Sequence, residues 1–111
     1  MSEFLRGDIV LCADSGGNFT GKPRPVVIVQ NTLYIEGMES LTVCPLTTFV
    51  ASPSLRVRLN ADEATGLKEK SDVEIDKVTT IRKSRITKKI GEVPEKALLK
   101  INNALRIWLD L

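Results

Sequence analysis

Apolar and β-branched residues recur in runs of strand length along the chain before residue 94. A strand is predicted over residues 6–12, where apolar and β-branched residues follow a Gly-Asp break, and another over residues 41–46. Residues 25–29 are apolar without interruption, which indicates a strand buried on both faces at the centre of a sheet. Residues 54–59 and 72–78 alternate apolar and polar positions, so each predicts a strand with one face on the core.

The two alternating segments carry charges on their outward faces. In residues 54–59 the pattern directs Arg56 and Arg58 away from the core, and in residues 72–78 it does the same for Glu74 and Asp76. Between these segments, residues 60–66 predict a single helical turn that begins at Asn60 and ends at Gly66.

The end of the chain predicts one substantial helix. Pro94 suits its first position, and an apolar stripe of helical spacing follows at Leu98, Ile101, Leu105 and Trp108. The segment 79–93 is mixed and basic, with a turn expected at Gly91. Strands first and one helix last predict an α+β, mainly β fold or small barrel. A length of 111 residues predicts one domain over residues 1–111.

Composition excludes several classes of chemistry. The chain has no histidine, so a Ser-His-Asp or Cys-His set is impossible, and it has no phosphate-binding glycine loop of the common types. Its two cysteines, Cys12 and Cys44, sit in apolar stretches and are expected to be buried, reduced thiols. We therefore expect neither a protein-bound metal nor a cofactor. No apolar run approaches the length that spans a bilayer, and we expect a cytoplasmic protein with no membrane partner.

Polar residues at predicted strand ends are the candidates for chemistry. Arg24 stands between two prolines just before the buried run 25–29, where its guanidinium could bind phosphate or could brace a loop by pairing with Asp14 or Asp76. The hydroxyls of Thr47 and Thr48 could bind phosphate or satisfy a backbone group at the strand end. Asp76 could orient an arginine, accept a proton or be a solvated surface charge.

A basic surface is the second functional feature. Residues 82–89 hold five cations, and Arg56 and Arg58 add two on one strand face, although the net charge is only +2. A nucleic-acid backbone is a natural partner for such a surface, and a solvated basic face is the alternative. The glycine-rich loop at residues 14–23 is long for a connection and is a second candidate for binding.

Taken together, these motifs resemble the MazF/PemK/Kid family of toxin endoribonucleases. The matching pieces are RGDIVL (6–11), RPVVIVQN (24–31), VCPLTT (43–48), DVEIDKVTTIRKSRI (72–86) and Gly91, in family order. The resemblance implies a small SH3-like barrel with a C-terminal α-helix, of the MazF/CcdB type. It also implies a homodimer that cleaves single-stranded RNA and is neutralised by a cognate antitoxin.

The resemblance places the catalytic residues at Arg24, Thr47 and Asp76, with Thr48 as the alternative hydroxyl. It implies metal-independent cleavage by a ribose 2′-hydroxyl, giving 2′,3′-cyclic phosphate and 5′-hydroxyl ends, with Asp76 orienting Arg24. The first loop departs from the family pattern, so the RNA sequence that is recognised does not transfer. The residues predicted to bind RNA are Asn18, Phe19, Thr20, Lys22, Thr48, Arg56, Arg58, Arg82, Lys83 and Arg85.

Two alternatives remain at this stage. A CcdB-like toxin of the same fold would bind DNA gyrase and cut no RNA, although the Arg24 and Thr47 pair argues against it. A catalytically inactive member of the fold would bind nucleic acid and leave it intact.

Overall fold

The computed structural model describes residues 3–13, 22–49 and 55–111. Within them the chain forms mostly short strands and ends in one long helix. The elements in order are β1 (Asp8–Cys12), β2 (Arg24–Ile28), η1 (Thr32–Tyr34), β3 (Ser40–Thr47), β4 (Val57–Leu59), β5 (Ser71–Val73), η2 (Ile75–Lys77), β6 (Thr79–Arg82), η3 (Lys83–Arg85), β7 (Ile86–Glu92) and α1 (Glu95–Leu109), where η marks a 3-10 helix.

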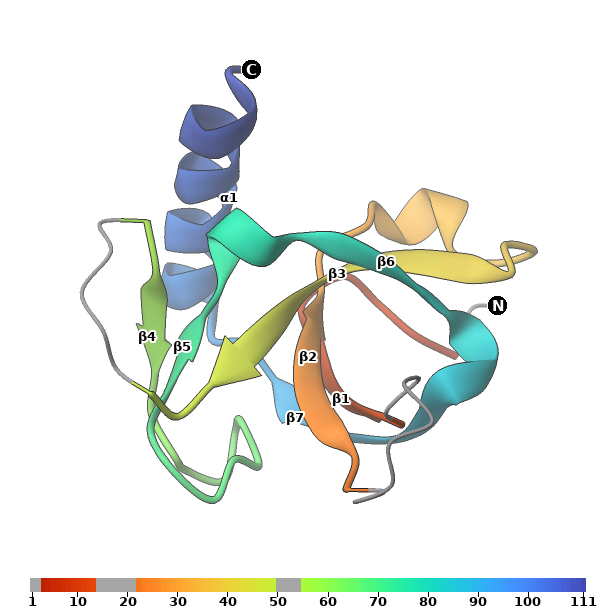
Figure 1. Cartoon of the computed structure of the whole chain (residues 1–111), viewed down its shortest axis with the longest axis horizontal. Helices are drawn as coiled ribbons and strands as arrows, with labels where there is room; N and C mark the ends of the chain where they lie inside the picture. The colour runs from red at the N-terminus through yellow and green to blue at the C-terminus, as the bar shows by residue number, and fades with distance from the viewer. Residues whose placement is uncertain (1–2, 14–21, 50–54) are drawn as a thin grey trace.

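The strands form one antiparallel sheet in the order β4-β5-β3-β2-β1-β7, and β6 also pairs with β3. Figure 1 shows the sheet curling into a barrel-like wall through β1, β2, β3, β6 and β7, while β4 and β5 extend beside α1. The predicted mainly β barrel with a closing helix is therefore the observed fold.

Alternation along the central strands builds two cores. Val26 and Ile28 of β2 join a cluster with β1, β3 and Ile35 on the concave side, whereas Val27 and Val29 join a cluster that α1 covers through Ile101. All four residues from Val26 to Val29 are buried, as predicted for the segment 25–29. Two cores on two faces explain why this run needs no polar position.

Pro45 lies where β3 changes neighbours. The first half of β3 pairs with β6, ending with Val43 opposite Thr79, and its last two residues pair with β5, Leu46 opposite Val73. Pro45 pairs with Val26 of β2 on one side, and its carbonyl accepts the N–H of Glu74 on the other. A residue without an N–H is tolerated at this switch because no strand there requires a donor.

Two predictions about local structure are wrong, and a third is correct except for its first residue. The segment 72–78 is not one strand, because β5 ends at Val73 and η2 follows. Residues 60–66 contain the predicted single helical turn, closed by a 2.9 Å bond from the N–H of Gly66 to the carbonyl of Asp62. The turn ends at Gly66, with φ of +68°, as predicted, but the side chain that caps it is that of Asp62, which accepts the N–H of Thr65 at 3.0 Å. Gly91 lies within β7, where a side chain would overlap the carbonyl of Thr65.

The helix prediction holds for its start and its inner half. Pro94 directly precedes α1, and Ile101 is fully buried. Trp108 is 48% exposed, because α1 extends past the sheet and its last turn has little to pack against (Figure 1). Cys12 and Cys44 are buried, reduced thiols, as predicted. In the described part of the chain, no helix has the length and apolarity needed to cross a membrane.

Candidate active site

The candidate site lies where β3 leaves β2. The last paired residues are Val26 and Pro45, and beyond them β3 turns away toward β5 (Figure 1). Arg24 and Thr47 each lie two residues past this pair, and alternation gives both the same face of the sheet as Val26. Arg24 is exposed and makes no ion pair or side-chain hydrogen bond with another described residue. The two residues thus share one face at the point where β2 and β3 part, and we call this point the opening.

A row of polar residues crosses the sheet next to Thr47. Thr47 lies directly opposite Asp72 of β5, and Asp72 lies opposite Arg58 of β4. Directly opposed residues of antiparallel strands share a face, so the three side chains are neighbours. The other face of the same strands carries Val57 and Val73, which pack in the core under α1.

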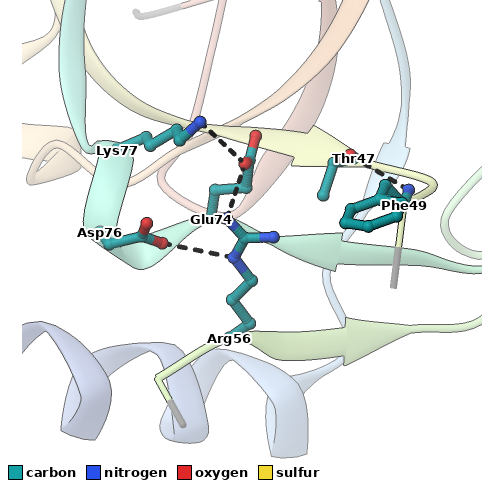
Figure 2. A network of polar contacts seen from close by, with 6 residues as sticks. All are labelled: Thr47, Phe49, Arg56, Glu74, Asp76 and Lys77. Atoms are coloured by element: carbon teal, nitrogen blue, oxygen red, sulfur yellow. Dashed lines mark hydrogen bonds and ion pairs between the residues drawn. The ribbon is translucent and has the colours of Figure 1, made fainter. Parts of the chain in front are cut away.

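The hydroxyl of Thr47 is partly engaged. Its oxygen accepts the backbone N–H of Phe49 at 3.1 Å, which leaves the hydroxyl proton free to donate (Figure 2). Thr48 is exposed and follows the last residue of β3, so the alternation of the strand includes Thr47 and not Thr48. Alternation favours Thr47 as the hydroxyl that faces the same side as Arg24.

Arg56 is the centre of an ion-pair network on this face. Its Nη2 lies 3.0 Å from Oε2 of Glu74, and its Nε lies 3.4 Å from Oδ1 of Asp76. Lys77 adds a contact of 3.7 Å to Glu74. Figure 2 shows the guanidinium between the two carboxylates, with Asp76 on the side away from Thr47. The Arg56 side chain is only 10% exposed.

This network corrects two sequence-based predictions. Asp76 was expected to orient Arg24, but its carboxylate pairs with Arg56, which comes from a different strand end. Arg56 was expected to grip RNA, but two of its nitrogens are committed to Glu74 and Asp76 and it is nearly buried. Arg56 is thus a brace between β4 and η2. Its neighbour Arg58 remains 47% exposed.

A groove of about 460 Å³ lies on the other side of the β3 end. Thr48 and Pro25 border it, and β7 and the loop before β5 complete its walls. Three lysines, Lys22, Lys68 and Lys88, line the groove together with one carboxylate, that of Glu69, and with apolar side chains. A groove in which cations outnumber carboxylates and whose walls are partly apolar suits a single-stranded nucleic acid, whose phosphates and bases need both kinds of contact.

The remaining residues predicted to bind RNA are distributed unevenly. Asn18, Phe19 and Thr20 lie outside the described residues. Lys22 and Thr48 line the groove. Arg82 pairs with Ser40 at the start of β3, seven residues from Thr47 and therefore roughly 23 Å along the strand. Lys83 follows it there, and its Nζ donates to the carbonyl of Ile35 at 2.9 Å.

Arg85 lies near the strand end that carries Arg24, away from Arg82 and Lys83. Its carbonyl accepts the N–H of Ala13, and the following residue, Ile86, pairs with Cys12, which also pairs with Arg24. One basic run in the sequence therefore serves two separate parts of the surface.

Sequence reasoning missed Asp72 and Lys68 as site residues, and it found Lys88 only as one cation of the basic run 82–89. Asp72 opens a segment in which only Glu74 and Asp76 drew attention as outward charges, and its proximity to Thr47 comes from the pairing of β3 with β5. The two lysines come from segments far apart in the chain, and the groove alone brings them together. Strand register was the signal needed for Asp72, and the packing of the loop before β5 beside β7 was the signal needed for the lysines.

Burial keeps the Cys44 thiol from acting as a nucleophile, because it disfavours the charged thiolate. Loss of solvent raises the pKa of this thiol to about 12, with Arg6 opposing the shift and Asp76 adding to it. A thiol with this pKa stays protonated at neutral pH and is unreactive. The same burial lowers the pKa of the Arg6 guanidinium. The chemistry of the site must therefore come from the arginines, hydroxyls and carboxylates.

A model of the PemK-like, MazF-like toxins of type II toxin-antitoxin systems matches residues 5–109. The chain belongs to this family. The probable endoribonuclease MazF of Mycolicibacterium smegmatis is 40% identical over 107 residues, 96% of either protein. The family resemblance inferred from the sequence is thereby confirmed. The relatives that match are endoribonucleases of this toxin family.

Solved structures of MazF toxins share the fold. Mycobacterium tuberculosis toxin MazF-mt6 is similar with a TM-score of 0.80 and 25% identity, over 94% of this chain and 97% of that one. An endoribonuclease from a mycobacterial species, solved in complex with its cognate antitoxin, has a TM-score of 0.78 and 27% identity, over 100% of this chain and 97% of that one. These structures confirm the predicted mainly β barrel with its C-terminal helix.

Proposed function

We propose that this chain is a MazF-type endoribonuclease toxin that cuts single-stranded RNA with its own side chains and no bound metal. The 2′-oxygen of a ribose forms a bond to the adjacent phosphorus while the bond to the 5′-oxygen breaks. The proton of the 2′-hydroxyl is lost and the leaving 5′-oxygen gains one, so the products are a 2′,3′-cyclic phosphate and a 5′-hydroxyl. The observation that carries the proposal is that Arg24 and Thr47 share a face where β2 and β3 part, beside a groove that three lysines line.

Arg24 is the group best suited to the reacting phosphate. Its side chain is exposed, and none of the described residues forms an ion pair or a side-chain hydrogen bond with its N–H donors. A fixed guanidinium stabilises the negative charge that develops on the phosphate oxygens in the transition state. The prolines on either side stiffen the backbone that presents it.

Thr47 would donate its remaining hydroxyl proton to a phosphate oxygen. The bond from the N–H of Phe49 fixes the position of the hydroxyl oxygen, so little rotamer freedom is lost when substrate binds. Asp76 would act at one remove, because its carboxylate holds Arg56 and lies beyond it from Thr47 (Figure 2). We therefore propose a supporting role for Asp76 in place of the orientation of Arg24.

RNA would cross the end of β3, with its backbone between the groove and the polar row. Lys22, Lys68 and Lys88 would neutralise phosphates on the groove side, and Arg58 would do so beside Thr47. Arg85 lies close enough to the Arg24 end to join them. Binding of this kind weakens as salt rises, because each neutralised phosphate releases counterions.

The proposal includes a homodimer and a cognate antitoxin as partners, and action on mRNA in the cytoplasm. A solved relative is described in complex with its cognate antitoxin. Large apolar side chains on and after α1 are exposed and could be covered in a dimer; they are Leu99, Ile107, Trp108, Leu109 and Leu111. Exposed apolar side chains gathered on one element are typical of an interaction surface.

Incubation of the purified protein with a long single-stranded transcript in EDTA tests this function. We expect discrete cuts whose upstream fragments end in a 2′,3′-cyclic phosphate and whose downstream fragments accept a new 5′-phosphate from polynucleotide kinase. Intact RNA, or cuts only when a divalent ion is restored, would contradict the proposal. RNA that is retained but uncut would identify an inactive, nucleic-acid-binding member of the fold.

A further inference from the structure

The ion pair between Arg58 and Asp72 lies directly beside Thr47. Nε of Arg58 is 2.9 Å from Oδ1 of Asp72, and the register puts Asp72 opposite both Arg58 and Thr47. The two side chains differ sharply in exposure, at 47% for Arg58 and 4% for Asp72. Because the Arg58 side chain is about half exposed, its guanidinium remains accessible to a ligand while it pairs with Asp72.

Arg56 and Arg58 occupy the same face of one strand edge but are held differently. Arg56 uses Nε and Nη2 on two carboxylates and is 10% exposed. Arg58 is held through its Nε by one carboxylate, that of Asp72, and its side chain is 47% exposed on the face of the sheet that also carries Thr47. A guanidinium anchored in this way can bridge a carboxylate and a phosphate.

We propose that Asp72 is a positioning residue that holds Arg58 beside Thr47, where the terminal nitrogens of Arg58 bind a phosphate of the RNA. This inference rests on the proposed ribonuclease function and adds to it a residue that does not touch substrate. Thr47 and Arg58 then contact the RNA backbone from the strands on either side of Asp72, while Arg24 contacts it from β2.

Asp72 needs such an explanation because its charge is unfavourable in two respects. A buried carboxylate loses its hydration, and a negative charge beside an RNA groove repels phosphates. Without the pair, Arg58 would be a long, half-exposed side chain with free rotamers, and binding a phosphate would have to fix them. Asp72 removes that entropy before RNA arrives.

A purely electrostatic role and a positioning role for Asp72 predict opposite changes in RNA affinity for the variant Asp72→Asn. If Asp72 acts only through its charge, its removal strengthens RNA binding and leaves cleavage as fast or faster. If Asp72 positions Arg58, the substitution weakens binding about tenfold, the effect of losing one charge-assisted hydrogen bond. The same factor is expected for Arg58→Ala, and the double variant should resemble Arg58→Ala alone because both changes remove one interaction.

The experiment uses two oligonucleotides that span a cut site mapped in a digested transcript. One is all ribose and reports kcat/KM, and the other has a 2′-O-methyl ribose at the cut and reports affinity over a salt series. Arg58→Ala should reduce the slope of log affinity against log salt by about 0.7, the value for one phosphate of a single strand. Asp72→Asn should move the slope in the same direction, which a purely structural role would not do.

Asp8→Asn is the matched control. Asp8 is a buried carboxylate, 3% exposed, that pairs with the part-exposed Lys89 at 3.2 Å, but it lies at the opposite end of β1 from Cys12 and Arg24. We expect this variant to keep wild-type affinity, kcat/KM and salt slope once both variants are confirmed as folded by circular dichroism.

Three results would overturn the inference while leaving the ribonuclease function intact. They are tighter RNA binding by Asp72→Asn, losses that multiply in the double variant, and an equal loss in Asp8→Asn. Failure of the wild-type protein to cut RNA would instead refute the function on which the inference rests. Normal cleavage by the wild type with the tenfold, non-additive losses described above would establish the positioning role.

Discussion

The two ends of β3 both carry charge, but they acquire it in different ways. At the Ser40 end, Arg82 and Lys83 come from one basic run in the sequence and border a hollow of about 310 Å³ with Met38 and Glu39. At the Thr47 end, the charged groups come from β2, β4 and β5 and meet only because the strands pair in one register.

The comparison shows that a run of charge in the sequence is a weaker sign of a site than charge assembled by register. At the Ser40 end, Lys83 already donates to the carbonyl of Ile35, so this cation stabilises the fold locally. At the Thr47 end, the Arg24 side chain has no partner among the described residues, and the Arg58 side chain is 47% exposed. We therefore expect catalysis and most RNA contacts at the Thr47 end.

Arg24→Ala should break this comparison most severely. Loss of the exposed Arg24 guanidinium should slow cleavage by about 10²–10³-fold, the effect of removing a preorganised charge-stabilising donor. Stability should change little, because the side chain is exposed. Single-turnover cleavage of the mapped oligonucleotide measures the effect. Arg82→Ala is the control at the Ser40 end, and an equal loss there would show that the two ends are not distinct.

Arg56→Met separates bracing from binding at the Thr47 end. The change leaves Glu74 and Asp76 without their shared partner, and we expect a loss of about 2–4 kcal/mol in the free energy of unfolding, typical of breaking a largely buried ion pair. Urea denaturation measures it. The salt slope of RNA binding should stay as in the wild type, because Arg56 has no exposed edge to offer. A reduced slope would mean that Arg56 binds phosphate after all.

The fold was largely predictable from the sequence because its signals are local. The uninterrupted run 25–29 indicated the central strand, and Pro94 with the stripe through Leu98 and Ile101 indicated the helix. The errors fall where tertiary contact overrides local pattern. Gly91 was predicted as a turn, but it is a glycine because the carbonyl of Thr65 crosses β7 at that point.

The site was predictable only in part. Arg24 and Thr47 were found as polar residues at strand ends, and both lie at the opening. The partner of Asp76 could not be inferred, since η2 replaces the end of the predicted strand and turns Asp76 toward Arg56. Asp72 was missed for a related reason. Asp72 matters because of its two cross-strand neighbours, Thr47 and Arg58. The pairing of β3, β4 and β5 that brings them together cannot be predicted from the residues of any one segment.

The variants Thr47→Val and Thr48→Val distinguish the two hydroxyls at the end of β3. Valine preserves the shape of threonine and removes its hydroxyl, so we expect a loss in kcat/KM of about tenfold for Thr47→Val, the value of one hydrogen bond to a charged group. Thr48 borders the groove and should show at most about a twofold change in affinity. Cleavage and binding of the same two oligonucleotides measure the split. The reverse order would assign the catalytic hydroxyl to Thr48.

Paired charge removals give the smallest and most direct test of the two ends. The double variant Lys68→Ala, Lys88→Ala removes two groove cations, and Arg82→Ala, Lys83→Ala removes two cations at the Ser40 end, so both lower the net charge equally. If RNA follows the groove, the first pair should reduce the salt slope by about 1.4, or 0.7 for each lost phosphate contact. The second pair should leave the slope nearly unchanged, since long-range attraction is screened beyond about 10 Å at moderate salt. Equal slopes would show that RNA contacts both ends, and the roughly 23 Å between them along β3 would then set the minimum length of RNA that binds fully.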